Sequence, residues 1–113
     1  MNETNCIFCK IVAGEVPSQL VAESEHTIAF NDMFPRKPVH VLVVPKNHYA
    51  NVSELAFENP AGLVDLVQLG AKVAEQLTDG DYRLTFNTGL AAGQSVFHAH
   101  GHVTSTKPKS QDE

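Results

Sequence analysis

Three histidines at alternate positions, His98, His100 and His102, are the residues of this sequence best suited to chemistry. Side chains alternate between the two faces of a β-strand, so a strand here would project all three imidazoles from one face, about 6.5–7 Å apart. Imidazole titrates near neutral pH, binds metals and can act as a nucleophile. The spacing therefore predicts a functional site, with a solvated polar face or an expression tag as the alternatives.

The residues around the histidines narrow the chemistry. Gly93-Gln94-Ser95 can present backbone N–H groups and a hydroxyl, which suit phosphate oxygens. A catalytic zinc cluster would want a carboxylate or a further histidine nearby and an open water position. The pattern favours acid–base or nucleophilic work on an anionic substrate, with metal ligation and a polar face still open. On the opposite face, Ala99 and Gly101 predict close packing by a helix or a second subunit.

A second candidate site is the C-x-x-C pair of Cys6 and Cys9. The N-terminal residues show no positive and apolar pattern of a secretory signal, and no stretch approaches the ~20 apolar residues of a membrane span. We therefore expect a soluble, cytoplasmic protein in which this pair is a metal or redox element rather than a disulfide. Two reduced cysteines packed as small hydrophobes are the alternative.

Length and charge limit the function classes. A chain of 113 residues forms one domain, and we expect it to span residues 1–104, with residues 105–113 as a disordered tail. The net charge of −5 argues against binding of a nucleic-acid polymer, which needs clustered Lys and Arg. A single nucleotide can still bind, because that takes only local groups.

The elements that must position these residues follow from hydrophobic periodicity. Asn59 and Pro60 predict the start of the main helix, which runs to about Leu77, and the apolar run 40–44 predicts a central strand. Gly70 within the helix predicts close packing against another element. The remaining elements are strands at 19–23, 27–31, 82–87 and through the histidines, a proline-bounded loop at 32–38 and a short helical turn at 52–55. This order predicts an α+β domain with a five-stranded, largely antiparallel sheet and one main helix.

These motifs together resemble the histidine triad (HIT) family, whose signature is three histidines separated by hydrophobic residues, and most closely its Hint-like branch. The resemblance covers residues 6–103, and no single motif would carry it alone. Besides the histidines, it rests on Phe30-Asn31-Asp32, Pro38-Val39-His40, Val44-Pro45-Lys46-Asn47-His48, Phe86-Asn87-Thr88-Gly89 and Gly93-Gln94-Ser95-Val96-Phe97.

The resemblance implies a homodimeric nucleotide hydrolase or nucleotidyl transferase. It would act at the α-phosphate of purine nucleoside phosphoramidates, adenylates or dinucleoside polyphosphates, through a covalent nucleotidyl-histidine and without a catalytic metal. His100 would be the nucleophile, with its other ring nitrogen bonded to a backbone carbonyl. His40 and His102 would donate to phosphoryl oxygens, and Ser95 would contact the phosphate or the leaving group. A nucleotide-binding scaffold with negligible turnover is the alternative function.

The same resemblance assigns the nucleoside contacts. Asp32 would accept the ribose hydroxyls, and Asn87 would contact a phosphoryl or 5′ oxygen. The alternatives are that Asp32 is a loop-capping carboxylate and that Asn87 is a turn residue leading to Gly89. Gln94 belongs to the substrate-binding loop, and the base would lie in an apolar slot made by Phe30, Met33 and Ile28.

The resemblance also implies a structural zinc site, since relatives with this C-x-x-C bind zinc there. The four ligands would be Cys6, Cys9, His48 and His98, which suit tetrahedral zinc. The chain departs from the family pattern at Gly101, where a bulky residue is usual, and after Val103, where the usual Gly-Gly-Arg continuation is replaced by Thr104-Ser105-Thr106-Lys107.

Overall fold

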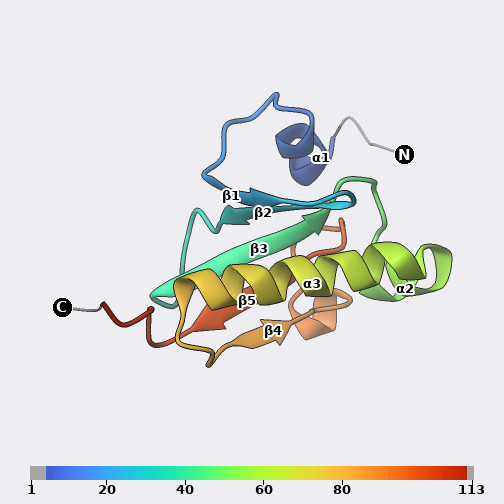
Figure 1. The fold of residues 1–113 in the computed structure, drawn as a ribbon. Helices are drawn as coiled ribbons and strands as arrows, with labels where there is room; N and C mark the ends of the chain where they lie inside the picture. The colour runs from blue at the N-terminus through green and yellow to red at the C-terminus, as the bar shows by residue number, and fades with distance from the viewer. Residues whose placement is uncertain (1–4, 112–113) are drawn as a thin grey trace.

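The computed structural model describes residues 5–111 as an α+β fold built on a five-stranded antiparallel sheet (Figure 1). The strand order is β1-β2-β3-β5-β4, so β3 is central, as its apolar run predicts. No helix of the described residues is long and apolar enough to cross a membrane. The elements in chain order are α1 (Ile7–Val12), β1 (Leu20–Glu23), β2 (Thr27–Asn31), β3 (Val39–Pro45), α2 (Val52–Glu58), α3 (Pro60–Leu77), β4 (Arg83–Thr85), the 3₁₀ turn η1 (Leu90–Ala92) and β5 (Gly101–Ser105).

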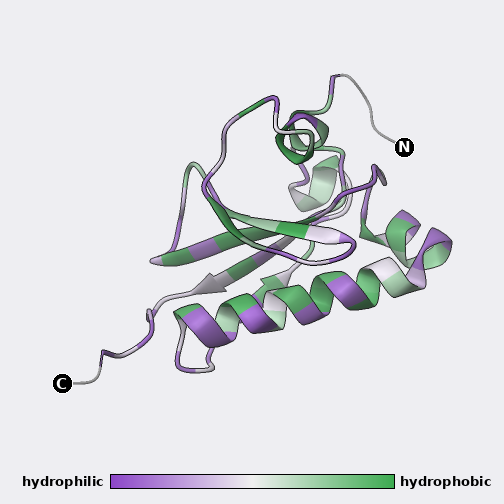
Figure 2. Cartoon of the chain, turned by 45° about the horizontal axis from the view of Figure 1, so that its top comes forward, coloured by the Kyte–Doolittle hydropathy of each residue, from purple (hydrophilic) through white to green (hydrophobic). Residues whose placement is uncertain are grey.

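The two faces of the sheet have different partners because side chains alternate along each strand. Val41 and Val43 of β3 face the main helix α3, which crosses the front of the sheet in Figure 1. Leu42 and Val44 point to the other face, where they pack with Phe8 of α1. In Figure 2 apolar and polar bands alternate along α3, and its buried residues, such as Leu66 and Val73, belong to the same core cluster as Val41 and Val43. The face covered by α3 thus forms the larger core, and the opposite face carries α1 and the histidines.

The helices begin where side chains cap them. The Asn59 side chain accepts from the Gly62 N–H at 3.0 Å, ahead of Pro60 at the first turn of α3, which confirms the predicted start. At α2 the Asn51 side chain accepts from the Glu54 N–H at 2.9 Å, and the Glu54 carboxylate accepts from the Ala50 N–H at 3.0 Å. This helix has seven residues, where the sequence predicted only a short turn. α1 is a helix not expected from the sequence, and its N-cap is Cys6, whose sulfur accepts from the Cys9 N–H.

The histidine segment corrects one expectation. β5 contains His102 but begins only at Gly101, so His98 and His100 precede the strand instead of belonging to it. The Ala99 N–H donates to the Tyr49 carbonyl at 2.6 Å, which draws this segment away from the strand ladder. β4 is correspondingly shorter than the predicted 82–87, because its pairing with β5 covers only three residues and ends opposite His102.

The small residues opposite the histidines are packed by the same chain. Ala99 lies in the core cluster beneath α3, and Gly101 lies against Leu84, Phe86 and Val43. The space that a bulky side chain would fill at position 101 is therefore occupied by side chains of β3, of β4 and of Phe86 just after β4. Within α3, Gly70 faces Val103 and Leu84, which confirms the close packing predicted for this glycine.

Part of the expected tail makes hydrogen bonds. β5 continues to Ser105, one residue past the expected domain boundary. Farther on, the Lys109 N–H donates to the Leu77 carbonyl at the end of α3, and Ser110 donates to Asp79. The described tail residues therefore add partners at the C-terminal end of the helix.

Asp65 fastens α3 to the turn between β1 and β2. Its Oδ2 accepts from the Ser24 hydroxyl at 2.6 Å, the Thr27 hydroxyl at 2.9 Å and the His26 N–H at 3.1 Å. Partial burial raises the pKa of the carboxyl, but these hydrogen bonds outweigh burial and hold the pKa below its ordinary 3.8.

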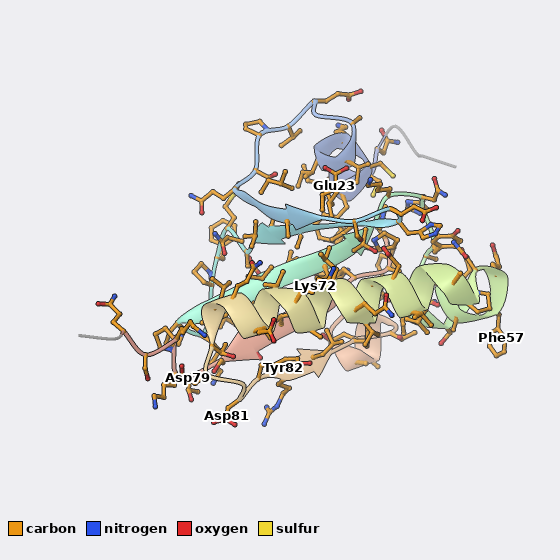
Figure 3. The ribbon with its side chains drawn as sticks, in the orientation of Figure 1. Glu23, Phe57, Lys72, Asp79, Asp81 and Tyr82 are labelled. Atoms are coloured by element: carbon orange, nitrogen blue, oxygen red, sulfur yellow. The ribbon has the colours of Figure 1, made fainter. Side chains whose placement is uncertain are left out.

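We predict that Asp65→Ala lowers the free energy of unfolding by about 1–3 kcal/mol at pH 7, because it strands the buried Thr27 hydroxyl and two further donors. A carboxyl with a lowered pKa stabilises the fold above its unfolded pKa and loses that effect as the pH falls through its folded pKa. Urea unfolding should therefore show a smaller deficit at pH 3 than at pH 7. Asp81→Ala, at an exposed site (Figure 3), is the control, and an equal deficit at both pH values would contradict the prediction.

A second prediction concerns the two packed glycines. A methyl group at Gly101 would lie 2.9 Å from Leu84 Cδ1 and 3.0 Å from Phe86 Cε1, so Gly101→Ala should cost roughly 1–3 kcal/mol. At Gly70 the nearest atom would be Val103 Cγ2 at 3.4 Å, an ordinary contact. Gly70→Ala should therefore gain about 0.5–1 kcal/mol of helix propensity. Thermal melting of both variants tests this, and a Gly101→Ala protein as stable as the parent would refute it.

Candidate active site and metal centre

A cavity of about 800 Å³ opens on the sheet face opposite α3, beside α1 and the loop 32–38. Its wall is apolar on the side of α1 and polar on the side of the histidines, an arrangement suited to a ligand with one apolar and one charged end. The predicted site residues that line it are Phe30, Asp32, Met33, Ser95, His100 and His102.

His100 is held in one tautomer by the backbone. Its Nδ1 lies 2.7 Å from the His98 carbonyl oxygen, which can only accept, so Nδ1 carries the proton. Burial lowers the pKa of the imidazole, against the opposing effect of that hydrogen bond, so the ring is neutral at pH 7. Nε2 therefore keeps its lone pair. The backbone carbonyl partner expected from the sequence is present.

The register between β3 and β5 brings His40 and His102 together. Leu42 pairs with His102 and His40 with Thr104, so the two histidines are diagonal neighbours on one face. His40 Nε2 lies 3.0 Å from His102 Nδ1 and 3.2 Å from Asp32 Oδ2. Burial, with His100 and His40 nearby, lowers the pKa of His102 to about 4.

The proton positions in this network follow from the Arg36 backbone. The Arg36 N–H donates to His40 Nδ1 at 3.1 Å, so His40 carries its proton on Nε2 and donates toward Asp32 and His102. With its Nδ1 accepting, neutral His102 has an N–H on Nε2 as a donor. Asp32, His40 and His102 lie close enough to hold a metal ion. A metal on His40 Nε2 would need a proton on Nδ1, where the Arg36 N–H already points, so this set does not fit a metal.

The other three residues predicted to bind substrate, Gln94, Asn87 and Ile28, are not among those that line the cavity. Gln94 is buried, and its side chain accepts from the Gly89 N–H and donates to the Ala50 and Val96 carbonyls, so its groups are used inside the protein. Asn87 Nδ2 donates to the Ala92 carbonyl across the same loop. Ile28 packs in the cluster with Phe8 behind the cavity wall.

Asp32 is a loop cap that also faces the cavity, and its predicted contact with the ribose stays a prediction. Its Oδ1 accepts from the Phe34 N–H at 2.9 Å, which is a loop cap, and it lines the cavity as well. Met33 is 74% exposed at the rim, whereas Phe30 is buried in the wall. A carboxylate has about four acceptor positions, so capping leaves it able to accept more donors.

The second predicted site is brought together from three distant parts of the chain. Cys6, Cys9, His48 and His98 offer ligand atoms that all lie within 4.8 Å of one another. His98 Nδ1 lies 3.3 Å from Cys6 Sγ and 3.5 Å from Cys9 Sγ, and His48 Nδ1 lies 3.4 Å from Cys9 Sγ. His98 Nε2 donates to the Pro45 carbonyl at 2.8 Å, so Nδ1 is unprotonated as a metal ligand must be. The group can hold a metal ion.

Sequence reasoning missed several residues that line the cavity, among them Leu42, Ile7 and Ile11. Leu42 lies two residues after His40 and therefore shares its face, a signal that strand alternation already contained. Ile7 and Ile11, one turn apart, line the cavity from α1. Recognition of 6–12 as a helix would have placed these two on one side.

Comparison with known proteins identifies this architecture. Residues 5–113 match the protein family described as "Scavenger mRNA decapping enzyme C-term binding". A solved HIT family hydrolase from Clostridium thermocellum is 46% identical, with a TM-score of 0.86 and 91% of each chain covered. This chain belongs to the histidine triad (HIT) family. A solved histidine triad protein from Clostridium difficile has a TM-score of 0.88 at 35% identity over 100% of both chains.

Two curated relatives bear on the HIT family assignment. Protein HitA of Neisseria gonorrhoeae is 39% identical over 104 residues, which cover 90% of this chain and 96% of the relative. The purine nucleoside phosphoramidase of Escherichia coli is 35% identical over 104 residues, covering 90% of this chain and 87% of that enzyme. The HIT fold predicted from the sequence is thus confirmed, and the chain is a HIT family hydrolase.

Proposed function

We propose that this HIT protein hydrolyses purine nucleoside phosphoramidates, or related adenylates and dinucleoside polyphosphates, at the α-phosphate. The observation that carries the proposal is the hydrogen bond from His100 Nδ1 to the His98 carbonyl, which leaves a neutral Nε2 lone pair at the cavity. Nε2 attacks the α-phosphorus, the bond to the amine breaks, and a nucleotidyl-histidine forms. Water then attacks the adduct, which releases the nucleoside monophosphate and restores the imidazole.

The phosphate contacts follow from the proton positions in the network. His102 donates from Nε2 to a phosphoryl oxygen, and His40 stabilises the neutral, correctly protonated state of His102. Ser95 is exposed at the cavity and donates to the leaving-group nitrogen. One N–H of the Asn87 amide donates to the Ala92 carbonyl, and the second N–H donates to a phosphoryl or 5′ oxygen.

The nucleoside lies along the apolar side of the cavity. Asp32 accepts the ribose hydroxyls, and Phe30 and Met33 contact the base. Ile28 supports Phe30 from behind, and Gln94 contributes by holding the loop that carries Ser95. No catalytic metal is needed, because the histidines and the serine supply both the nucleophile and the donors.

We further propose that the metal held by Cys6, Cys9, His48 and His98 is a structural zinc ion. Two thiolates and two neutral imidazoles are a donor set typical of tetrahedral zinc, and zinc of this kind stabilises the fold instead of reacting. We also propose a cytoplasmic homodimer, as the family resemblance implies. Exposed Val64 and Val67 on α3 supply apolar surface for a second copy.

The central prediction concerns the nucleophile. His100→Ala should lower kcat/KM for adenosine phosphoramidate by about 10⁴-fold or more, because the covalent route is lost. Stopping the parent reaction in acid and analysing it by mass spectrometry should show one adenylyl group on His100. His26→Ala, a partly exposed histidine outside the cavity, should keep parental turnover.

Retained turnover in His100→Ala would contradict the nucleophile assignment. Tight binding of adenosine monophosphate by the parent, without hydrolysis of any phosphoramidate, adenylate or dinucleoside polyphosphate, would favour the nucleotide-binding scaffold instead.

The zinc proposal has its own prediction. The purified protein should contain about one zinc ion per chain by atomic emission, and Cys9→Ser should contain much less, because a hydroxyl replaces a thiolate ligand. Zinc added to the stripped parent should raise its melting temperature, whereas the same addition to stripped Cys9→Ser should not. Equal zinc contents in the two proteins would refute the site.

A further inference from the structure

We infer that the metal centre of Cys6, Cys9, His48 and His98 positions the nucleophile His100, acting through the His98 backbone and through Phe8. This inference rests on the proposed function, because it takes His100 as the attacking residue. It assigns Phe8 as a positioning residue, a role that neither its type nor its spacing indicates.

The first connection is His98, which serves both sites. Its imidazole is completely buried, with Nδ1 toward the two cysteine sulfurs and Nε2 donating to Pro45 of β3. Its carbonyl oxygen accepts the proton of His100 Nδ1 at 2.7 Å. A residue held at both ring nitrogens cannot turn its backbone freely, so the position of the carbonyl depends on the ligand group.

The second connection is Phe8, which stands between the two cysteines in α1 and is 6% exposed. Its ring meets His98 edge-on, with centroids 5.9 Å apart, and meets His100 at 5.0 Å with the planes 85° apart. Such edge-to-face contacts restrict how a ring can tilt or turn. The segment formed by Cys6 and α1, which carries both thiols, therefore also holds one aromatic ring in contact with His98 and with His100.

The two connections act on different properties of His100. The His98 carbonyl selects the tautomer that exposes the Nε2 lone pair, and Phe8 limits the ring's orientation. Neither segment is part of the regular sheet: α1 packs on it from outside, and His98 precedes β5. The ligand group joins α1 to His98 and to the loop after β3, and so stabilises both connections.

The direct test is the tautomer of His100 in the full chain, read from ¹⁵N NMR of the imidazoles with one equivalent of zinc and after removal by a chelator. We expect one tautomer, protonated at Nδ1, in the zinc form. In the stripped form we expect a mixture with the tautomer protonated at Nε2. If the protein takes up no zinc, or if the tautomer is identical in both forms, the inference is wrong.

The kinetic test is Phe8→Leu in the zinc-loaded protein. A misplaced nucleophile predicts a fall in kcat on the order of tenfold to a hundredfold, with KM within about twofold of the parent. Phe57→Leu makes the same change at a side chain that is 88% exposed at the end of α2 and points away from the body of the protein (Figure 3). It should keep parental kinetics.

Val44→Ala controls for lost stability, because Val44 is completely buried in the same apolar cluster as Phe8. It should lower the melting temperature and leave kcat near the parental value at a temperature where it is folded. A Phe8→Leu protein that changes only KM, or that loses no more kcat than Val44→Ala, would refute the positioning role. If the parent hydrolyses no nucleotide at all, the proposed function fails, while the NMR measurement still decides whether the metal centre controls the His100 tautomer.

Discussion

The antiparallel pairing of β3 with β5 is the constraint on which the rest of this structure depends. β3 is buried along its whole length, so each of its side chains must pack against the elements on one face of the sheet or on the other. The pairing of Leu42 with His102 places the last histidine of the triad, His40 and the wall of the cavity on the face away from α3. A slip of one residue would carry the histidine into the core beneath the helix, where its polar nitrogens would lack partners. The apolar contacts under α3 therefore protect the register that the site requires.

Within the site, hydrogen bonds to the backbone decide what each imidazole can do. The His98 carbonyl, the Arg36 N–H and the Pro45 carbonyl assign the protons of His100, His40 and His98 respectively. Burial lowers the pKa of His98, His100 and His102, which favours their neutral forms at pH 7. Three chemically identical side chains two residues apart thereby become a candidate metal ligand, a candidate nucleophile and a hydrogen-bond donor.

Regular elements were predictable where local physics suffices. Asn59 and Pro60 mark the start of α3 because capping and a fixed φ act within one turn, and the apolar run of β3 identifies a strand covered on both sides. The strand through His98 and His100 was predicted wrongly because the Ala99 N–H finds its partner in Tyr49, fifty residues away. α1 was missed for a related reason, since a six-residue helix depends on its contacts more than on its own propensity.

The sequence by itself determined which residues can do chemistry: the alternating histidines, the C-x-x-C pair and the motifs typical of the HIT family, together with an α+β fold of five strands. Those are properties of residue type and short-range periodicity. Only the tertiary structure decided the tautomers of His40 and His100, the internal role of Gln94 and the place of Phe8 between the candidate metal ligands and the candidate nucleophile. Each of these depends on a hydrogen bond or ring contact whose direction is set by packing between segments distant in the chain, which no local pattern encodes.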